Sequence, residues 1–103
     1  MTTTTVPTTI SAEATAHVAE LGMGEQFRQM LDHIRQTVTG LRSIDVILNR
    51  IVDEDYRPLV ALDVWINCPD WENDRTNMSI FEWEIDTFPP EVLQHFCISI
   101  CYE

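Results

Sequence analysis

An acidic stretch, Asp70-Trp71-Glu72-Asn73-Asp74, places carboxylates at alternate positions, which is the spacing at the start of a calcium-binding loop. Such a loop also needs glycine at its sixth position for the sharp turn and glutamate at its twelfth as a bidentate ligand. In this chain those positions hold Arg75 and Phe81. The sequence therefore predicts a solvated acidic loop and no metal site.

Three cysteines are the next candidates for metal or redox chemistry, and the separation of Cys97 and Cys101 occurs in zinc sites. On a strand the two would lie about 13 Å apart at about 3.3 Å per residue. Two thiolates on one zinc, each bonded at about 2.3 Å, lie no more than about 4.6 Å apart. A site joining His95 and Cys97 to Cys68 stays open. We expect free, buried cysteines in a reducing compartment, the cytoplasm.

Histidine, serine and cysteine side chains can act as bases and nucleophiles when they converge. None of the local motifs that bring them together is present. The only glycines are Gly22, Gly24 and Gly40, and there is no His-Glu-x-x-His sequence and no nucleophile elbow. The absence of lysine removes Schiff-base chemistry. We expect no cofactor, and a small enzyme of unknown chemistry is an alternative function.

Trp71 lies among polar and charged neighbours, where a large aromatic side chain has no obvious core to enter. Tryptophan is a preferred anchor at protein interfaces. The sequence therefore predicts a partner-binding patch of aromatic and acidic residues. Its members are Asp70, Trp71, Glu72, Asp74 and Trp65. The alternative is that the loop folds back and buries Trp71 against the helix that follows it.

The N-terminal part of the chain predicts a short helix after a polar segment. Residues 1–10 are rich in threonine and contain Pro7, so we expect a flexible tail or a short edge strand there. Ser11 is a typical N-cap and Gly22 a typical stop signal. Together they predict a helix over about 12–21.

A stronger helical stripe follows, with six apolar residues on one face between residues 23 and 38. Gly40 is placed to end this helix. Arg28 and Asp32, four positions apart, can form an ion pair across one turn. Beyond Gly40 the apolar period changes from helical to two, which predicts a strand over about 43–52.

Two further strands and a third helix complete the predicted domain. Apolar alternation up to Ile66, after a polar turn closed by Pro58, predicts an antiparallel hairpin with the preceding strand. Alternation over 96–102 predicts a final strand. The third helix is predicted from four apolar residues at helical spacing: Met78, Phe81, Ile85 and Phe88. We assign Phe81 and Phe88 to the core.

These elements predict an α+β fold, a two-layer α/β sandwich of order α-α-β-β-α-β that forms a single domain over residues 11–103. Placing the last strand beside the first gives a right-handed crossover and a three-stranded mixed sheet of order 2-1-3, with helices mainly on one face. The order 1-2-3 is the alternative. The other face would collect Ile47, Ile51, Ala61, Trp65, Cys97 and Cys101. A semi-apolar face of this kind predicts a homodimer interface, unless the first helix or the N-terminal tail covers it.

The charge of the chain has a strong sign bias, since 17 Asp and Glu residues stand against six basic residues, all of them Arg, for a net charge of −11. This field repels phosphate and anionic lipid, so we expect no nucleic-acid and no membrane partner. It attracts basic protein surfaces. The predicted function is a small acidic protein-binding module, antitoxin- or inhibitor-like, which docks a basic partner protein.

Residues 4–35 combine a threonine-rich possible strand, a capped helix, the Gly22 turn and a second helix. This order resembles a ribbon-helix-helix DNA-binding unit. The resemblance implies a DNA-binding antitoxin or regulator, in which the strand reads the major groove and pairs with the same strand of a dimer partner. In this chain the matching stretch, 3–10, contains Pro7 and no Lys or Arg.

Overall fold

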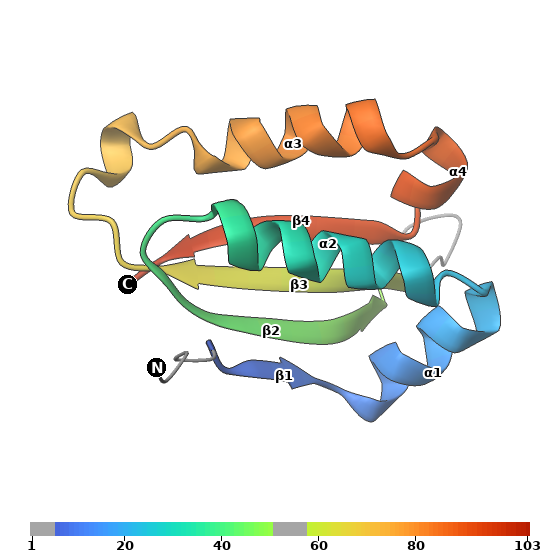
Figure 1. Cartoon of the computed structure of the whole chain (residues 1–103). Helices are drawn as coiled ribbons and strands as arrows, with labels where there is room; N and C mark the ends of the chain where they lie inside the picture. Colours follow the sequence, from blue (N-terminus) through green and yellow to red (C-terminus); the bar gives the residue numbers. More distant parts are fainter. Residues whose placement is uncertain (1–5, 51–57) are drawn as a thin grey trace, which may run out of the picture.

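A computed structural model describes residues 6–50 and 58–103 and shows a mixed α+β fold, as the sequence predicts (Figure 1). In chain order the elements are β1 (Thr8–Ile10), α1 (Ala12–Leu21), α2 (Gly24–Thr37), β2 (Leu41–Arg50), β3 (Pro58–Ile66), the 3-10 turn η1 (Trp71–Asn73), α3 (Thr76–Thr87), α4 (Pro90–Leu93) and β4 (Phe96–Tyr102). The sequence predicts a strand over about 43–52, and its last two residues lie outside the described residues. The predicted hairpin turn at 53–57 and the first five residues of the chain also lie outside them.

The sheet has four strands in the order β1-β2-β3-β4. β1 is parallel to β2, β2 is antiparallel to β3, and β4 is parallel to β3 with Phe96 beside Val60. The predicted order 2-1-3 is therefore wrong, and the last three strands follow the alternative order 1-2-3. The edge of β2 is already occupied by β1, where Thr8 pairs with Ile44. β1 is a short edge strand, which the sequence allows for residues 1–10 as the alternative to a flexible tail. The predicted three-stranded sheet does not include it, because three residues show little apolar alternation.

β1 belongs to the sheet of its own chain. Besides its pairing with β2, its Thr8 Oγ1 accepts a hydrogen bond from Arg35 Nη2 at the end of α2, at 2.9 Å. In a ribbon-helix-helix unit the corresponding strand pairs with the dimer partner. The likeness to that family is thus limited to the order of the elements.

The first helix is capped as its sequence predicts, and the second ends earlier. The Ser11 Oγ accepts a hydrogen bond from the Ala14 amide at 3.1 Å, and Gly22 ends α1 in the left-handed conformation at φ 67°. α2 ends at Thr37, because Val38 is already extended. Gly40, at φ 75°, instead makes the turn into β2, where a side chain would meet the Asn67 carbonyl oxygen at 2.5 Å.

One core lies between the helices and one face of the sheet. Its largest fully buried side chains are Met30, Ile34, Ile44, Leu62, Ile66, Val46, Val60 and Val64. Ala14 and Val18 of α1 and Ile80 of α3 belong to the same cluster, so these helices cover the same face as α2 (Figure 1). Because strand side chains alternate, the intervening residues of the strands point to the face without helices.

Candidate functional site

Trp71 lies on the surface at the end of the sheet. Its side chain is 56% exposed, and its ring is 6.2 Å from that of Tyr102 between centroids, tilted by 47°. The Asp70 carboxylate accepts a hydrogen bond from the Asn73 side-chain amide at 2.9 Å, which closes the turn. The indole thus lies against the end of β4 and is not buried against α3. Asp70 and Glu72 are exposed on either side of it.

Asp74, by contrast, is occupied by hydrogen bonds within the protein. Its carboxylate accepts from the Thr76 hydroxyl at 2.7 Å and from the Tyr102 hydroxyl at 3.0 Å. Burial alone would raise the pKa of Asp74, but the hydrogen bonds from Thr76 and Tyr102 hold it below its usual value. Burial and the bond to Asp74 raise the pKa of Tyr102. Asp74 therefore joins the start of α3 to the end of β4.

Trp65 is separated from the other four predicted patch residues by the sheet. It pairs with Cys101, the residue before Tyr102, so its side chain points to the opposite face from Tyr102. Trp65 is half-buried there. The structure therefore keeps Asp70, Trp71 and Glu72 together in one exposed loop and places Trp65 on another surface.

The face that carries Trp65 is the semi-apolar face predicted from the sequence, for those of its residues that the structure describes; Ile51 lies outside them. Ile47 is 46% exposed there, and Cys97 is also exposed. α1 does not cover this face, because its buried residues belong to the core on the other side.

Two carboxylates stand side by side in the middle of that face. The register of β2 and β3 places Asp45 directly opposite Asp63. Like charges in such a pair destabilise a sheet. Burial raises the pKa of the neighbouring Cys101 thiol, and the charges of Asp63 and Asp45 raise it further. Cys101 is therefore a poor nucleophile.

α3 exposes three of the four apolar residues from which the sequence predicts this helix. Met78, Phe81 and Ile85 are 57%, 56% and 53% exposed, whereas Ile80 and Phe88 are buried. The assignment of Phe81 to the core is therefore wrong, and that of Phe88 is confirmed. The helix carries apolar side chains on two sides, and only the side with Ile80 faces the sheet. The exposed stripe is a candidate interaction surface that the sequence reasoning missed, although the spacing of its members was visible.

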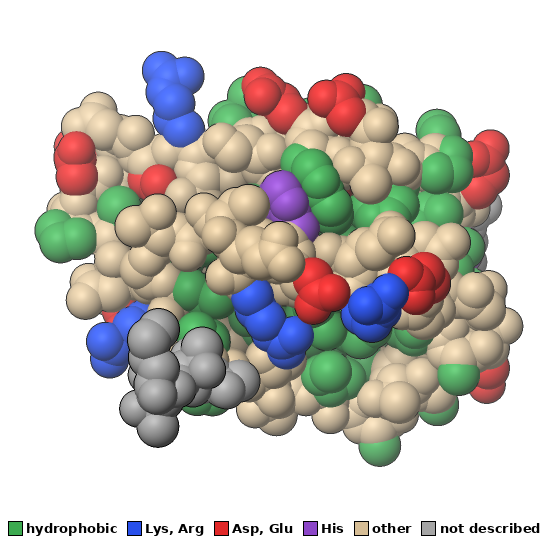
Figure 2. All heavy atoms as spheres, viewed as in Figure 1, with side chains coloured by type: hydrophobic (Ala, Val, Ile, Leu, Met, Phe, Trp, Pro, Cys, Tyr) green, Lys and Arg blue, Asp and Glu red, His purple; other side chains and the backbone are tan. Residues whose placement is uncertain are grey.

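Acidic residues are concentrated around this stripe. Residues 70–91 contain seven carboxylates and a single basic residue, Arg75. The seven are Asp70, Glu72, Asp74, Glu82, Glu84, Asp86 and Glu91. Acidic side chains lie over α3, at the top of the view in Figure 2, with hydrophobic side chains beside them. We call the exposed apolar residues Trp71, Met78, Phe81 and Ile85, with these carboxylates, the α3 surface.

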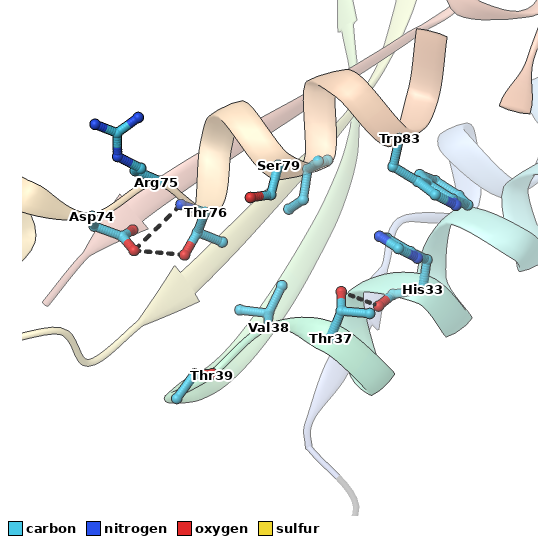
Figure 3. Close-up of a pocket in the computed structure, with 10 residues that line it drawn as sticks. His33, Thr37, Val38, Thr39, Asp74, Arg75, Thr76, Ser79 and Trp83 are labelled. Carbon is cyan, nitrogen blue, oxygen red and sulfur yellow. Dashed lines mark hydrogen bonds between the residues drawn. The ribbon is translucent and has the colours of Figure 1, made fainter. Parts of the chain in front are cut away.

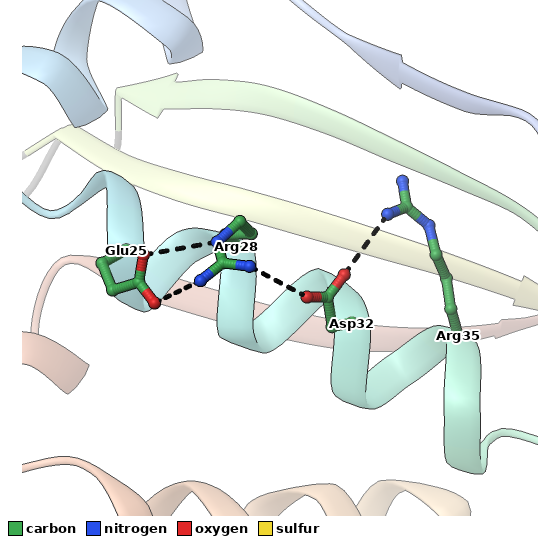
Figure 4. A network of polar contacts seen from close by, with 4 residues as sticks. All are labelled: Glu25, Arg28, Asp32 and Arg35. Carbon is green, nitrogen blue, oxygen red and sulfur yellow. Dashed lines mark hydrogen bonds and ion pairs between the residues drawn. The ribbon is translucent and has the colours of Figure 1, made fainter.

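The charges on the outer face of α2 are arranged differently, because they neutralise one another (Figure 4). Arg28 pairs with Glu25 and, at 3.8 Å, with Asp32, as its spacing predicts. Arg35 pairs with Asp32 at 3.8 Å. Two arginines thus balance two carboxylates on α2, which leaves the α3 surface with a large share of the unbalanced negative charge.

A groove runs between α3 and β4. Its volume is about 240 Å³, and it is mostly apolar. It is lined by Phe81, Glu84, Ile85, Leu93, Phe96, Cys97 and Ile98. Burial raises the pKa of Glu84, the one ionisable carboxylate in this lining. We call this feature the α3–β4 groove.

A second cleft, of about 520 Å³, lies between the end of α2 and the start of α3 (Figure 3). The His33 ring stacks on the Trp83 ring with centroids 3.8 Å apart and an angle of 4° between planes. Burial lowers the pKa of His33. The Thr37 hydroxyl in this cleft donates a hydrogen bond to the His33 carbonyl oxygen at 2.7 Å. This bond holds the hydroxyl against the backbone of α2. A stacked imidazole and a hydroxyl bonded to the backbone of its own helix fit packing between α2 and α3.

Within residues 6–50 and 58–103, no three His, Cys, Asp or Glu side chains are grouped so that they could hold a metal ion. No helix of the described part of the chain has the length and apolar character that crossing a membrane requires. Comparison of the chain with protein-family models, with curated proteins and with solved structures gives no match.

Proposed function

We propose that this chain is a small acidic protein-binding module of the antitoxin or inhibitor kind, which docks a basic partner protein. The observation that carries the proposal is the α3 surface, where Trp71, Phe81 and Ile85 are each more than half exposed among carboxylates. Exposed apolar residues grouped on one surface and rimmed by charge are typical of protein interaction sites.

The two components of this surface have different roles in binding. Aromatic anchors that become fully desolvated supply most of the free energy of an interface. Carboxylates around the anchors increase the rate of association with a basic partner and disfavour acidic or nucleic-acid partners. Salt screens both effects. Arg75 is the one basic residue within residues 70–91, so most carboxylates of this segment have no cation close in sequence, and a basic partner would supply cations to them.

The experiment is capture of partners from a cell extract on the immobilised protein, at about 50 mM and about 500 mM salt. Wild type is compared with a double variant, Trp71→Ala with Glu72→Gln, which leaves Asp74 and its hydrogen bonds intact. The matched control, Ile47→Ser with Glu13→Gln, changes one exposed apolar and one exposed acidic residue outside the α3 surface. Captured proteins are identified by mass spectrometry and then purified for affinity measurement.

The expected result is one or a few basic proteins that bind wild type and the control, are lost at high salt, and bind the Trp71 variant about 30-fold more weakly. The same set of proteins on wild type and on the Trp71 variant would refute the proposal. So would binding that grows stronger with salt.

A further inference from the structure

The outer edge of β4 is free in the part of the chain that the structure describes. β4 pairs with β3 alone, at the end of the sheet order. The bonds at the two ends of this pairing run from the Val60 amide to the His95 oxygen, at 2.9 Å, and from the Glu103 amide to the Ile66 oxygen, at 3.1 Å. Odd-numbered residues of β4 therefore bond to β3. The backbone groups of Phe96, Ile98, Ile100 and Tyr102 point away from the sheet.

The sequence of β4 lacks the residues that usually protect an edge strand. Natural edge strands are interrupted by proline, bulges or charged side chains, which prevent another strand from pairing with them. The sequence of β4, Phe-Cys-Ile-Ser-Ile-Cys-Tyr, has no proline, glycine or charge, and its pairing with β3 runs in register over seven residues. An unprotected edge of this length is a template for one more strand.

The α3–β4 groove lies directly beside this edge. Phe81 and Ile85 line it from α3, and Phe96 and Ile98 line it from β4. A strand added to β4 would alternate its side chains, so every second one would enter this groove. Phe81 and Ile85, both more than half exposed without a partner, would then be covered.

Glu84 adds a charge requirement to this apolar groove. It is part of the groove lining, and burial raises its pKa, so its ionised form lacks hydration there. A cation beside it would stabilise the ionised form. Residues 70–91 around it carry seven carboxylates and one Arg. An occupant with Lys or Arg is therefore favoured over an occupant with Asp or Glu.

We propose that the free edge of β4 binds an extended segment of a basic partner as a fifth strand, with apolar side chains in the α3–β4 groove and a Lys or Arg beside Glu84. The inference rests on the proposed function and names the chemistry of the partner. A second copy of this chain fits less well. Pairing β4 with β4 would bring two acidic α3 surfaces together, and this chain has no lysine to place between them.

The test uses the whole protein and a blocked heptapeptide of alternating valine and arginine, with two control peptides. In one control glutamate replaces arginine, and in the other alternate backbone amides are N-methylated so that they cannot donate. Binding is followed by amide NMR, and hydrogen exchange is measured at β4. With peptide at about ten times its Kd, exchange at the Ile98 and Ile100 amides should slow about tenfold, because these amides point outward. Neither control peptide should cause this.

Two variants locate the site. Phe81→Ser and Glu84→Gln should each lower the affinity of the protein for the peptide, and Phe81→Ser should lower it by about tenfold or more. Ile47→Ser and Glu13→Gln, which change exposed residues elsewhere, should leave its affinity unchanged. All four sites are at least partly exposed, so the variants should fold.

Three results would overturn strand addition. The first is no peptide binding up to about 1 mM. The second is binding without slower exchange at Ile98 and Ile100. The third is a dimer in solution whose Ile98 and Ile100 amides are protected before peptide is added, since the edge would then be occupied by a second copy. The proposed function is tested separately. If the Trp71 variant loses its captured partner while Phe81→Ser and Glu84→Gln retain it, the chain binds a partner but not through β4.

Discussion

At the scale of single residues, the contact between Asp74 and Tyr102 joins the loop, α3 and β4, and it depends on ionisation. Tyr102→Phe removes the hydroxyl that donates to the Asp74 carboxylate and retains the ring beside Trp71. We expect the free energy of unfolding near pH 7 to fall by about 1 kcal/mol.

The pH dependence of this loss has a defined sign. The pKa of Asp74 is lower in the folded protein than in the unfolded chain. Its stabilising effect is therefore complete above the unfolded pKa, about 3.9 for Asp, and is lost as the pH falls through the folded pKa. Urea unfolding of wild type and Tyr102→Phe should give the full difference at pH 7 and a smaller one at pH 3. An equal difference in unfolding free energy at pH 7 and pH 3 would contradict the proposed role of the Asp74 carboxylate.

Two glycines with positive φ differ in their surroundings, which permits a matched comparison. An alanine at Gly22, φ 67°, would meet no atom within 4 Å, whereas one at Gly40, φ 75°, would meet the Asn67 carbonyl oxygen at 2.5 Å. Both substitutions strain the backbone, by about 1 kcal/mol. Gly40→Ala must also displace the end of β3. We expect the larger fall in melting temperature for Gly40→Ala, and equal falls would refute the clash.

At the scale of elements, α3 is apolar on two sides, and burial distinguishes them. Ile80→Ala should lower the free energy of unfolding by about 2–4 kcal/mol, because Ile80 is 2% exposed in the core. Phe81→Ala should change it by no more than about 0.5 kcal/mol, because that side chain is mostly in solvent. Chemical denaturation of both variants measures the difference. A large loss for Phe81→Ala would mean that its side chain is buried in solution.

Elements with one clear period could be predicted from the sequence. The alternation in β2, β3 and β4 and the stripe of α2 each indicate both the element and the side that is buried. Helical spacing in α3 fits two stripes, and which one faces the sheet depends on packing against α2 and β4. The predicted position of β4, beside β2, was wrong because strand order depends on which edges of the sheet are free. The three residues of β1 occupy the outer edge of β2, so β4 pairs with β3.

The candidate site could be predicted only in part for similar reasons. Polar neighbours explain why Trp71 is not in the core, and that is a local property. Trp65 and Trp71 are close in sequence, but strand alternation sends Trp65 to the other face of the sheet. The hydrogen bond from Tyr102 to Asp74 joins residues 28 positions apart, so no local pattern indicates it.

At the scale of the whole molecule, the net charge of −11 should affect the stability of the fold as well as the proposed binding. Carboxylates on α3 repel one another within a Debye length of about 10 Å at 0.1 M salt. Screening should therefore raise the melting temperature between about 20 mM and about 500 mM NaCl. A Glu82→Gln, Asp86→Gln variant should show a smaller rise. A melting temperature that falls with salt would show that ion pairs such as those on α2 dominate instead.

The open edge of β4 also has a consequence for handling and evolution of the protein. An uncharged strand with a free side is the kind of surface from which cross-β aggregates grow. At neutral pH the mutual repulsion of highly charged copies opposes such growth, and this protection disappears near the isoelectric point of about 4.4. We therefore expect the acidity of the chain to oppose cross-β growth from β4 at neutral pH, and this opposition to weaken near pH 4.4.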